Sequence, residues 1–265
     1  MIHPTGKIPT RTLEADMPSG KSLTSLPVYD RSLLPEPGSD LSGGAVFLVD
    51  KPADWSSFDV VKFLRNRIRT RKTGHAGTLD PLATGLLILC AGRATKVISQ
   101  IQELPKRYHA QVQLGASTPS QDSATEPDAH APVAHITEEQ VRNVLKEQFS
   151  GTIRQLPPMY SALWKDGKRL YTYARKGLEV ERAHREVVIH DIRLVSFHED
   201  RMELDVLCSK GTYVRTLAHD LGIALGSLAH LTGLRRTATG PYHVDDAVQI
   251  DQIRSFYDKG HEFTR

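Results

Sequence analysis

Long apolar runs, cysteines and metal-binding spacings are scarce in this sequence. No apolar run approaches the roughly 18 residues that a membrane-spanning helix needs, so we expect no membrane segment. The N-terminus has no apolar signal core, which favours a cytoplasmic protein. Only Cys90 and Cys208 are present, and a chain without an export signal rarely forms disulfides. The 12 histidines show no metal-ligand spacing, so we expect no bound metal.

A strong charge of one sign is also absent, because 34 basic residues face 31 acidic ones and the net charge is +3. The basic residues are nevertheless concentrated in two groups, the second of which includes two tyrosines. The groups are Lys62, Arg65, Arg67, Arg69, Arg71 and Lys72, and then Lys165, Lys168, Arg169, Tyr171, Tyr173, Arg175 and Lys176. Basic side chains bind phosphates and aromatic rings stack on bases. The two groups therefore favour an RNA surface over ordinary solvated helix faces.

The hydrophobic pattern predicts an α+β fold with a mixed, mainly antiparallel sheet and flanking helices. Strands are expected at residues 45–49, 86–90, 106–115, 187–189, 204–207 and 232–240. Capping signals predict helices after Ser56 and Thr137. Further helices are expected at 93–102, 168–176, 213–225 and 248–256.

Residues 1–43 contain six of the 15 prolines and show little periodicity. This composition predicts a poorly ordered N-terminal extension. Residues 44–265 are then expected to form one domain.

A short, glycine-rich, polar stretch runs from Gly74 to Gly85, just before the predicted strand at 86–90. It is not a phosphate-binding P-loop, because two leucines follow its last glycine where that loop needs Lys and then Ser or Thr. It also precedes a strand, whereas a dinucleotide fingerprint follows one. The stretch is therefore neither of these two cofactor-binding motifs. Asp80 stands before Pro81, a pair that commonly starts a turn, but an acid held beside a buried strand also suits an active site.

The stretch from Gly74 to Gly85 resembles the catalytic motif of TruB-type tRNA pseudouridine synthases. Further blocks match that family in the same order. They are Lys51-Pro52 with Ser56-Ser57, Lys106-Arg107-Tyr108, Pro157-Pro158-Met159-Tyr160-Ser161-Ala162, and Cys208-Ser209-Lys210-Gly211-Thr212-Tyr213-Val214-Arg215-Thr216. The resemblance covers residues 44–250, and several ordered blocks are more specific than any one motif.

The resemblance implies a pseudouridine synthase fold with a central active-site cleft. It implies an isomerase that converts the uridine at position 55, in the T-loop of tRNA, to pseudouridine without a cofactor. Residues 44–265 would be the catalytic domain and residues 156–184 an insertion that grips RNA. Only about 25 residues follow Gly240, too few for the PUA domain that most family members carry. A monomer without an obligate protein partner is expected.

Residue by residue, the resemblance makes Asp80 the essential carboxylate. Three routes remain open for it, namely attack on the sugar, attack on the base at C6, and removal of the 2′ proton. Arg215 would pair with it. Asp122 aligns with an acid that contacts this arginine, although its loop departs from the family's Asp-x-x-Gly pattern.

The remaining matched residues would contact the extruded uridine. Tyr108 would stack on the base and is a candidate for removing the C5 proton. His75 would fill the space that the flipped nucleotide leaves, and Tyr213 and Leu234 would line the base pocket. Arg235 and Arg236, which follow directly, are predicted to contact phosphate.

Two alternatives stay open at the level of sequence. The chain can be an RNA-binding protein that assists tRNA folding without modifying it. It can also be a synthase directed by a guide RNA, like archaeal and eukaryotic relatives.

Overall fold

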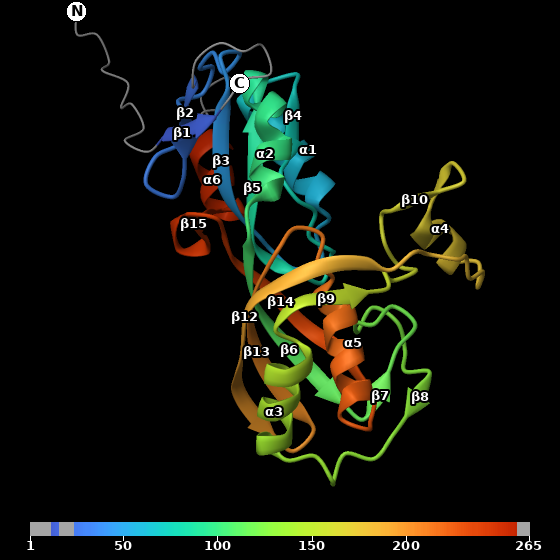
Figure 1. The fold of residues 1–265 in the computed structure, drawn as a ribbon. Coiled ribbons are helices and arrows are strands. Elements are labelled where there is room, and N and C mark those ends of the chain that lie inside the picture. Colours follow the sequence, from blue (N-terminus) through green and yellow to red (C-terminus); the bar gives the residue numbers. More distant parts are fainter. Residues whose placement is uncertain (1–11, 16–23, 259–265) are drawn as a thin grey trace, which may run out of the picture. The chain divides into compact units, whose positions relative to one another are not determined.

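The computed structural model describes residues 12–15 and 24–258. The chain divides into two compact units. Unit 1 comprises residues 1–104 and 235–265, and unit 2 comprises residues 105–234. Each unit combines helices with a sheet, so the predicted α+β class is confirmed (Figure 1).

Unit 1 contains a mixed sheet. Its strands follow the order β1 (Thr12–Ala15), β2 (Thr24–Tyr29), β3 (Ala45–Lys51), β5 (Thr84–Ala91) and the end of β14 (Ala229–Thr239). Short strands β4 (Thr73–His75), β15 (Tyr242–His243) and β16 (Val248–Gln249) pair with β5, β14 and β3. The β2–β3, β5–β14 and β3–β16 pairs are parallel and the other pairs are antiparallel.

The core of unit 1 lies on β3 and β5, whose apolar residues are almost completely buried. Around them lie α1 (Ser57–Ile68), η1 (Gly92–Val97), α2 (Ile98–Glu103), η2 (Val244–Asp246) and α6 (Ile250–Asp258). The capping box predicted from Ser56 and Asp59 begins α1. The single helix predicted at 93–102 is instead a 3-10 turn followed by a short α-helix.

The prediction of poor order is wrong for residues 24–43. These residues belong to unit 1, and the predicted boundary at residue 44 falls inside it. Strand β2 pairs with β3, and Leu26 and Val28 alternate into the core with 1% and 2% exposure. Burial of these apolar residues outweighs the high proline content. Residues 1–11 and 16–23 lie outside the described part.

Unit 2 is built on an antiparallel sheet with the order β6 (Lys106–Leu114), β13 (Arg201–Cys208), β12 (Arg185–His198) and β9 (Gly151–Gln155). The strands predicted at 187–189 and 204–207 lie within β12 and β13, which form a hairpin. Helix α3 (Glu138–Gln148) packs on β12 and helix α5 (Val214–Ala224) on β6. Thr137 and Gln140 form the predicted capping box of α3. Gly151 opens β9 with a φ of 78°.

Two further segments of unit 2, residues 116–135 and the predicted insertion, carry short elements. Strands β7 (Ala116–Ser117) and β8 (Ala129–His130) pair within residues 116–135. The insertion contains the hairpin β10 (Trp164–Lys165) and β11 (Lys168–Arg169), followed by α4 (Leu170–Ala174). Trp164 and Tyr171 are exposed there. In the described part of the chain, no helix is long and apolar enough to cross a membrane.

Candidate active site

The loop that carries Asp80 connects β4 to β5 inside unit 1. The carbonyl of Asp80 accepts a hydrogen bond from the amide of Ala83 at 3.0 Å, which closes a four-residue turn. Pro81 occupies the second position of that turn, where its fixed φ is favourable. The Asp80-Pro81 pair therefore does start a turn, and the turn gives the carboxylate a defined position on the chain.

Contacts on both sides of Asp80 hold its main chain. The hydroxyl of Ser57, in the first turn of α1, accepts from the amide of Leu79 at 2.8 Å and donates to the carbonyl of Leu79 at 3.0 Å. The amide of Asp54 donates to the carbonyl of Pro81 at 2.9 Å. The two peptide neighbours of Asp80 are thus tied to the first residue of α1 and to the segment before it.

Lys51 also supports the loop that carries Asp80. Its side chain is completely buried at the end of β3. The ammonium donates to the carbonyls of Pro52, Trp55 and Pro81. Burial lowers the pKa of Lys51 to about 8, an effect that the nearby carboxylate of Asp80 opposes. Lys51 is therefore both a link in the loop scaffold and a source of positive charge near Asp80.

The free energy of unfolding should depend on pH through the titration of Lys51, and we expect Lys51→Met to remove that dependence. The pKa of Lys51 is lowered from 10.5 to about 8 on folding, so the unfolded chain binds more protons between these values. The free energy of unfolding of the parent, relative to that of Lys51→Met, therefore rises as pH increases from about 8 to about 10.5. This gain is lost as pH falls back through 8. One pKa unit corresponds to about 1.4 kcal/mol, and part of the change lies outside this pH range because Lys51 is half titrated at each pKa. The expected rise between pH 8 and 10.5 is therefore about 2 to 3 kcal/mol.

Urea denaturation of both proteins across this pH range measures the difference. Lys146→Met, at an exposed position of α3, is the matched control and should follow the parent curve. If the parent and Lys51→Met stabilities change in parallel with pH, Lys51 is not the titrating group.

Arg236 supports the loop from β14. It is 1% exposed, and its Nε donates to the carbonyl of Leu86 at 2.6 Å. One Nη donates to the carbonyl of Gly77 at 3.2 Å and the other to that of Thr78 at 3.5 Å. Arg235 forms a bidentate pair with Asp50 at 2.8 and 3.0 Å. The prediction that Arg236 contacts phosphate is therefore wrong, because its buried guanidinium holds this internal scaffold. The same prediction for Arg235 stays a prediction, since its side chain is 40% exposed.

Gly85 allows β5 to approach β14 at this point. Its φ is 99°, and a Cβ added there would lie 2.3 Å from the carbonyl oxygen of Arg236. Only glycine combines this backbone conformation with so close a contact. The last glycine of the motif is therefore required by the packing of the strand, not by a bound phosphate.

His75 closes β4 immediately before the loop. Burial lowers its pKa, and the charge of Arg236 lowers it further. The imidazole is therefore neutral at neutral pH, because its ordinary pKa of 6.5 is already below that value. A neutral, half-buried ring can pack against a base or form one hydrogen bond without adding charge.

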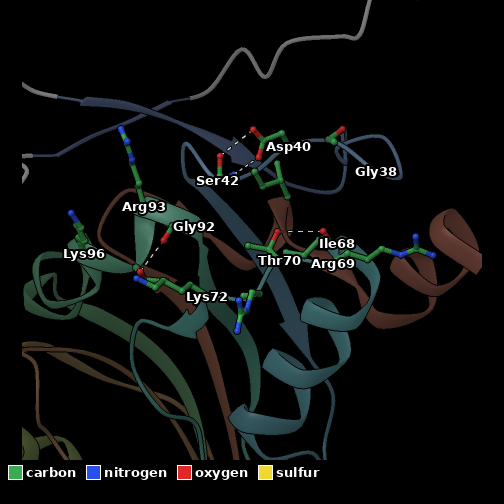
Figure 2. A pocket seen from close by; sticks show the side chains of 14 residues that line it. Gly38, Asp40, Ser42, Ile68, Arg69, Thr70, Lys72, Gly92, Arg93 and Lys96 are labelled. Carbon is green, nitrogen blue, oxygen red and sulfur yellow. Dashed lines mark hydrogen bonds between the residues drawn. The ribbon is translucent and has the colours of Figure 1, made fainter.

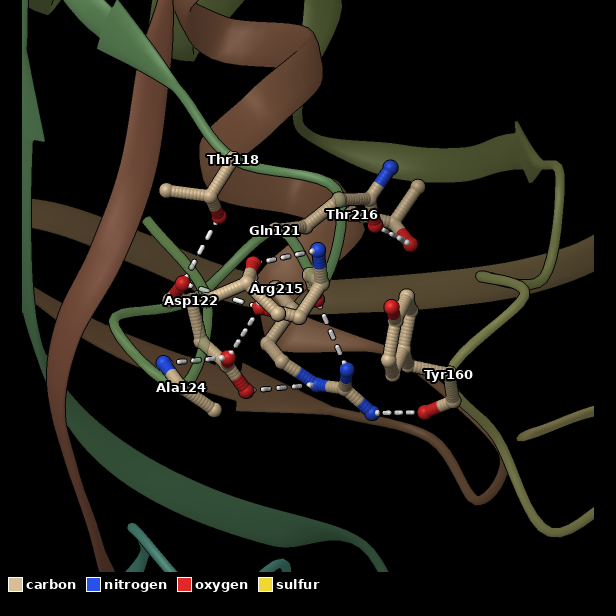
Figure 3. A network of polar contacts seen from close by, with 9 residues as sticks. Thr118, Gln121, Asp122, Ala124, Tyr160, Arg215 and Thr216 are labelled. Atoms are coloured by element: carbon tan, nitrogen blue, oxygen red, sulfur yellow. Dashed lines mark hydrogen bonds and ion pairs between the residues drawn. The ribbon is translucent and has the colours of Figure 1, made fainter. Parts of the chain in front are cut away.

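In unit 2 the structure brings Arg215 and Asp122 together (Figure 3). The two side chains are 5% and 6% exposed, and Nε of Arg215 lies 3.6 Å from Oδ2 of Asp122. The Nη atoms of Arg215 donate to the carbonyls of Ser120 at 2.8 Å and Tyr160 at 2.9 Å. Arg215 therefore joins the start of α5 to two loops of unit 2.

Asp122 is held in turn by its own loop. Its Oδ1 accepts from the hydroxyl of Ser120 at 2.6 Å and from the amide of Ala124 at 3.0 Å. Gln121 adopts a φ of 61° and accepts from the hydroxyl of Thr216 at 2.9 Å (Figure 3). Although the loop departs from the Asp-x-x-Gly pattern, the carboxylate of Asp122 therefore still accepts hydrogen bonds from more than one donor.

The other predicted residues of unit 2 lie on three elements. Tyr108 points to the buried side of β6 and is 9% exposed. Tyr213 is half-buried immediately before α5. Leu234 is half-buried within β14.

A strongly basic pocket of about 670 Å³ lies in unit 1 (Figure 2). Residues 38–42 form one wall. Residues 68–72, at the end of α1 and just after it, and the start of η1 form the others. Its cationic side chains are Arg69, Arg71, Lys72, Arg93 and Lys96. Within the described residues, none of these five forms a salt bridge, and all five are exposed. The one carboxylate of the lining, Asp40, accepts from the amide and hydroxyl of Ser42 at 2.9 and 3.0 Å.

Sequence reasoning missed the residues that hold the loop, namely Lys51, Ser57 and Arg236. Lys51 and Ser57 were visible only as parts of the family's opening. The place of Lys51 shortly after the apolar run 45–49 and directly before Pro52 is the one local sign that this lysine is buried.

Comparison with known proteins identifies the family. The model of the TruB family pseudouridylate synthase N-terminal domain matches residues 65–214, and that of the tRNA pseudouridylate synthase B C-terminal domain matches residues 215–263. The chain is 49% identical over 217 residues to tRNA pseudouridine synthase B of Chlorobium luteolum, covering 80% of this chain and 75% of the relative. It is 48% identical over 215 residues to that of Bordetella parapertussis, covering 80% and 88%.

A solved structure agrees with these matches. A chain in the crystal structure of a Cbf5-Nop10-Gar1 complex superposes with a TM-score of 0.62 and 28% identity. The match covers 82% of this chain and 56% of that one, so this chain spans little more than half of its length. Since the first family model alone covers more than half of the 265 residues, the chain belongs to the TruB family of pseudouridylate synthases.

Proposed function

We propose that this chain converts the uridine at position 55 of tRNA to pseudouridine, with Asp80 as the catalytic carboxylate. The observation that carries the proposal is the loop scaffold in unit 1. Three elements separated in sequence grip the peptide groups around Asp80 through Lys51, Ser57 and Arg236. Such an arrangement presets a functional group before substrate binds. The membership of the TruB family supports the reaction.

The reaction is an isomerisation that needs no redox partner or group donor. The bond from C1′ of the ribose to N1 of the base breaks, and the base rotates. A new bond then joins C1′ to C5. The proton on C5 leaves to solvent and N1 gains a proton, so atoms and charge balance.

Asp80 takes part as a nucleophile or a base by one of the three routes left open. In this proposal the guanidinium of Arg215 orients and stabilises that carboxylate, as charge-assisted hydrogen bonds do. Asp122 holds Arg215, a role that its 3.6 Å ion pair with Arg215 supports. Tyr108 stacks on the base and is the candidate for removing the C5 proton.

Three further residues receive the extruded nucleotide. His75 fills the space left in the RNA, and its lowered pKa suits a neutral ring among bases. Tyr213 and Leu234 line the base pocket. Extruding a base costs a few kcal/mol of stacking, so contacts to the RNA backbone must offset this cost.

The substrate surface consists of two parts in this proposal. The basic pocket of unit 1 binds phosphates of the tRNA T-arm. The insertion presents Trp164 beneath the guanidinium of Arg169 at 4.3 Å, together with Tyr171, a combination suited to stacked bases. We place the enzyme in the cytoplasm as a monomer that needs neither protein partner nor cofactor.

Tritium release tests the proposal. A tRNA transcript labelled at C5 of uridine is incubated with the purified full chain, and label appears in water as C5 loses its proton. A transcript with cytidine at position 55 is the control and should release none from that position. Release at the same level from both transcripts, or from neither, would refute the assignment.

The second candidate is a guide-RNA-dependent synthase, because similar chains come from a Cbf5-Nop10-Gar1 complex and from the Nop10-Cbf5 complex of an archaeal box H/ACA ribonucleoprotein. The same experiment separates the two. Turnover of a bare transcript by the chain alone excludes dependence on a guide particle. A chain that only assists tRNA folding would bind the transcript without releasing label.

The basic pocket of unit 1 leads to a further testable prediction. We expect Arg93→Ser combined with Lys96→Ser to weaken tRNA binding about tenfold at low salt, since fewer counterions are released when fewer cations meet phosphates. The slope of log affinity against log salt should fall by about 0.9 for each phosphate that is no longer bound. Filter binding at several salt concentrations measures both quantities.

Arg201→Ser is the matched control, because its side chain is 80% exposed on β13 and its ion pair with Asp200 is long, at 3.9 Å. An unchanged slope in the double variant would mean that the pocket binds no phosphate.

A further inference from the structure

One cross-strand pair of unit 2 grips a single residue at the start of α5. Gln155 and Arg185 face each other in the β9–β12 ladder. Both reach Tyr213, one at its main chain and the other at its ring. None of the family motifs described above includes Gln155 or Arg185.

Gln155 acts on the main chain. It is completely buried, its Oε1 accepts from the amide of Tyr213 at 3.0 Å, and its Nε2 donates to the carbonyl of Tyr213 at 3.2 Å. Tyr213 is the N-cap of α5 and provides no side-chain cap of its own. The amide of Gln155 therefore fixes where α5 begins, and with it the position of Arg215 two residues later.

Arg185 acts on the ring. Its guanidinium carbon lies 4.3 Å from the ring centroid of Tyr213. Burial lowers the pKa of Arg185, and its Nε has no hydrogen-bond partner among the described residues. A partly desolvated guanidinium interacts more strongly with an aromatic face than a hydrated one. The ring is thus held on one face while Tyr213 remains half-exposed.

The turn at Gly211 passes beside the same guanidinium. Its φ is 79°, and a Cβ added there would lie 3.5 Å from a terminal nitrogen of Arg185, in ordinary van der Waals contact. The turn that leads into α5 therefore lies next to Arg185 as well as to Tyr213.

We infer that Gln155 and Arg185 are positioning residues that preset Tyr213 for the flipped uridine. The inference rests on the proposed function, because it takes Tyr213 as part of the base pocket. A residue that presets a pocket changes the rate of the bound complex, whereas a residue that grips the RNA backbone changes affinity.

The test compares Arg185→Met with Arg185→Lys. Methionine keeps an unbranched chain over the ring but removes the charge, and lysine keeps the charge. We expect Arg185→Met to lower the single-turnover rate about five- to tenfold, with the dissociation constant for tRNA changed by less than about twofold. Arg185→Lys should recover most of the rate. Arg193→Met, on the same strand and with a 63% exposed side chain, controls for the loss of one positive charge.

A double-mutant cycle asks whether Arg185 acts through Tyr213. In a Tyr213→Ala background, Arg185→Met should have no further effect on the rate, because the ring that it positions is gone. Additive effects would overturn the inference. Weaker binding with an unchanged rate would also overturn it, since Arg185 would then contact RNA directly.

Gln155→Glu provides an independent variant. Glutamate keeps the acceptor for the amide of Tyr213 but removes the donor to its carbonyl, so the rate should fall with binding retained. If this variant does not fold, the Arg185 variants decide the question alone. The parent enzyme separates the two proposals, because a parent without turnover refutes the proposed function. An active parent with an equally active Arg185→Met refutes only this inference.

Discussion

Asp80→Asn is expected to abolish turnover while leaving tRNA binding nearly intact. Asparagine has almost the same shape, so the turn from Asp80 to Ala83 and the grip on Leu79 and Pro81 should persist. The variant removes only the charge and basicity of one carboxylate. Groups that act directly on a reacting bond contribute at least about 10² to 10⁴ in rate, so we expect a fall of about 10³-fold or more.

Tritium release and filter binding on the same preparations separate rate from affinity. Asp54→Asn is a suitable control, because Asp54 lies in the same scaffold but contacts the loop through its main-chain amide. Appreciable turnover by Asp80→Asn would refute the catalytic assignment. Loss of binding together with turnover would show instead that the carboxylate maintains the RNA surface.

Arg215→Met is expected to be the most destabilising single change that we consider. It removes the partner of Asp122, whose side chain is 6% exposed, and it leaves the carbonyls of Ser120 and Tyr160 without this donor. Removing one member of a buried ion pair costs about 3 to 5 kcal/mol, because the other charge stays buried. We expect a loss of about 3 kcal/mol or more in the free energy of unfolding.

Urea denaturation at neutral pH measures this loss. Arg142→Met is the matched control, because its pair with Glu138 is 53% exposed on both sides and should contribute less than about 1 kcal/mol. Adding Asp122→Asn to Arg215→Met should restore part of the stability, since it removes the uncompensated charge. A double variant that is less stable than Arg215→Met would contradict this explanation.

The parts of the fold that depend on neighbouring residues were predictable from sequence. The capping boxes of α1 and α3 involve residues three apart. Alternation along β6 correctly placed Tyr108 among buried side chains. The β12–β13 hairpin joins segments that follow each other directly. In each case the signal lies within one turn or one strand.

The contacts that support the candidate site have no such local signal. Lys51 meets Pro81 across 30 residues, Gln155 meets Tyr213 across 58, and Arg236 meets Leu86 across 150. Each contact joins a side chain to a main-chain group, and every residue presents the same main-chain atoms. Sequence patterns therefore cannot identify the partner. For this reason the sequence suggests a phosphate contact for Arg236, although its guanidinium binds carbonyls within unit 1.

The side chains that support the Asp80 loop all form hydrogen bonds with its main-chain atoms, and this has a consequence for engineering. Ser57, Lys51 and Arg236 would bind the same amides and carbonyls whatever side chains the loop carried. Thr78 is exposed and offers only its carbonyl to Arg236. A library of variants at Thr78 can thus change what this surface recognises, while the main-chain path of the loop stays the same.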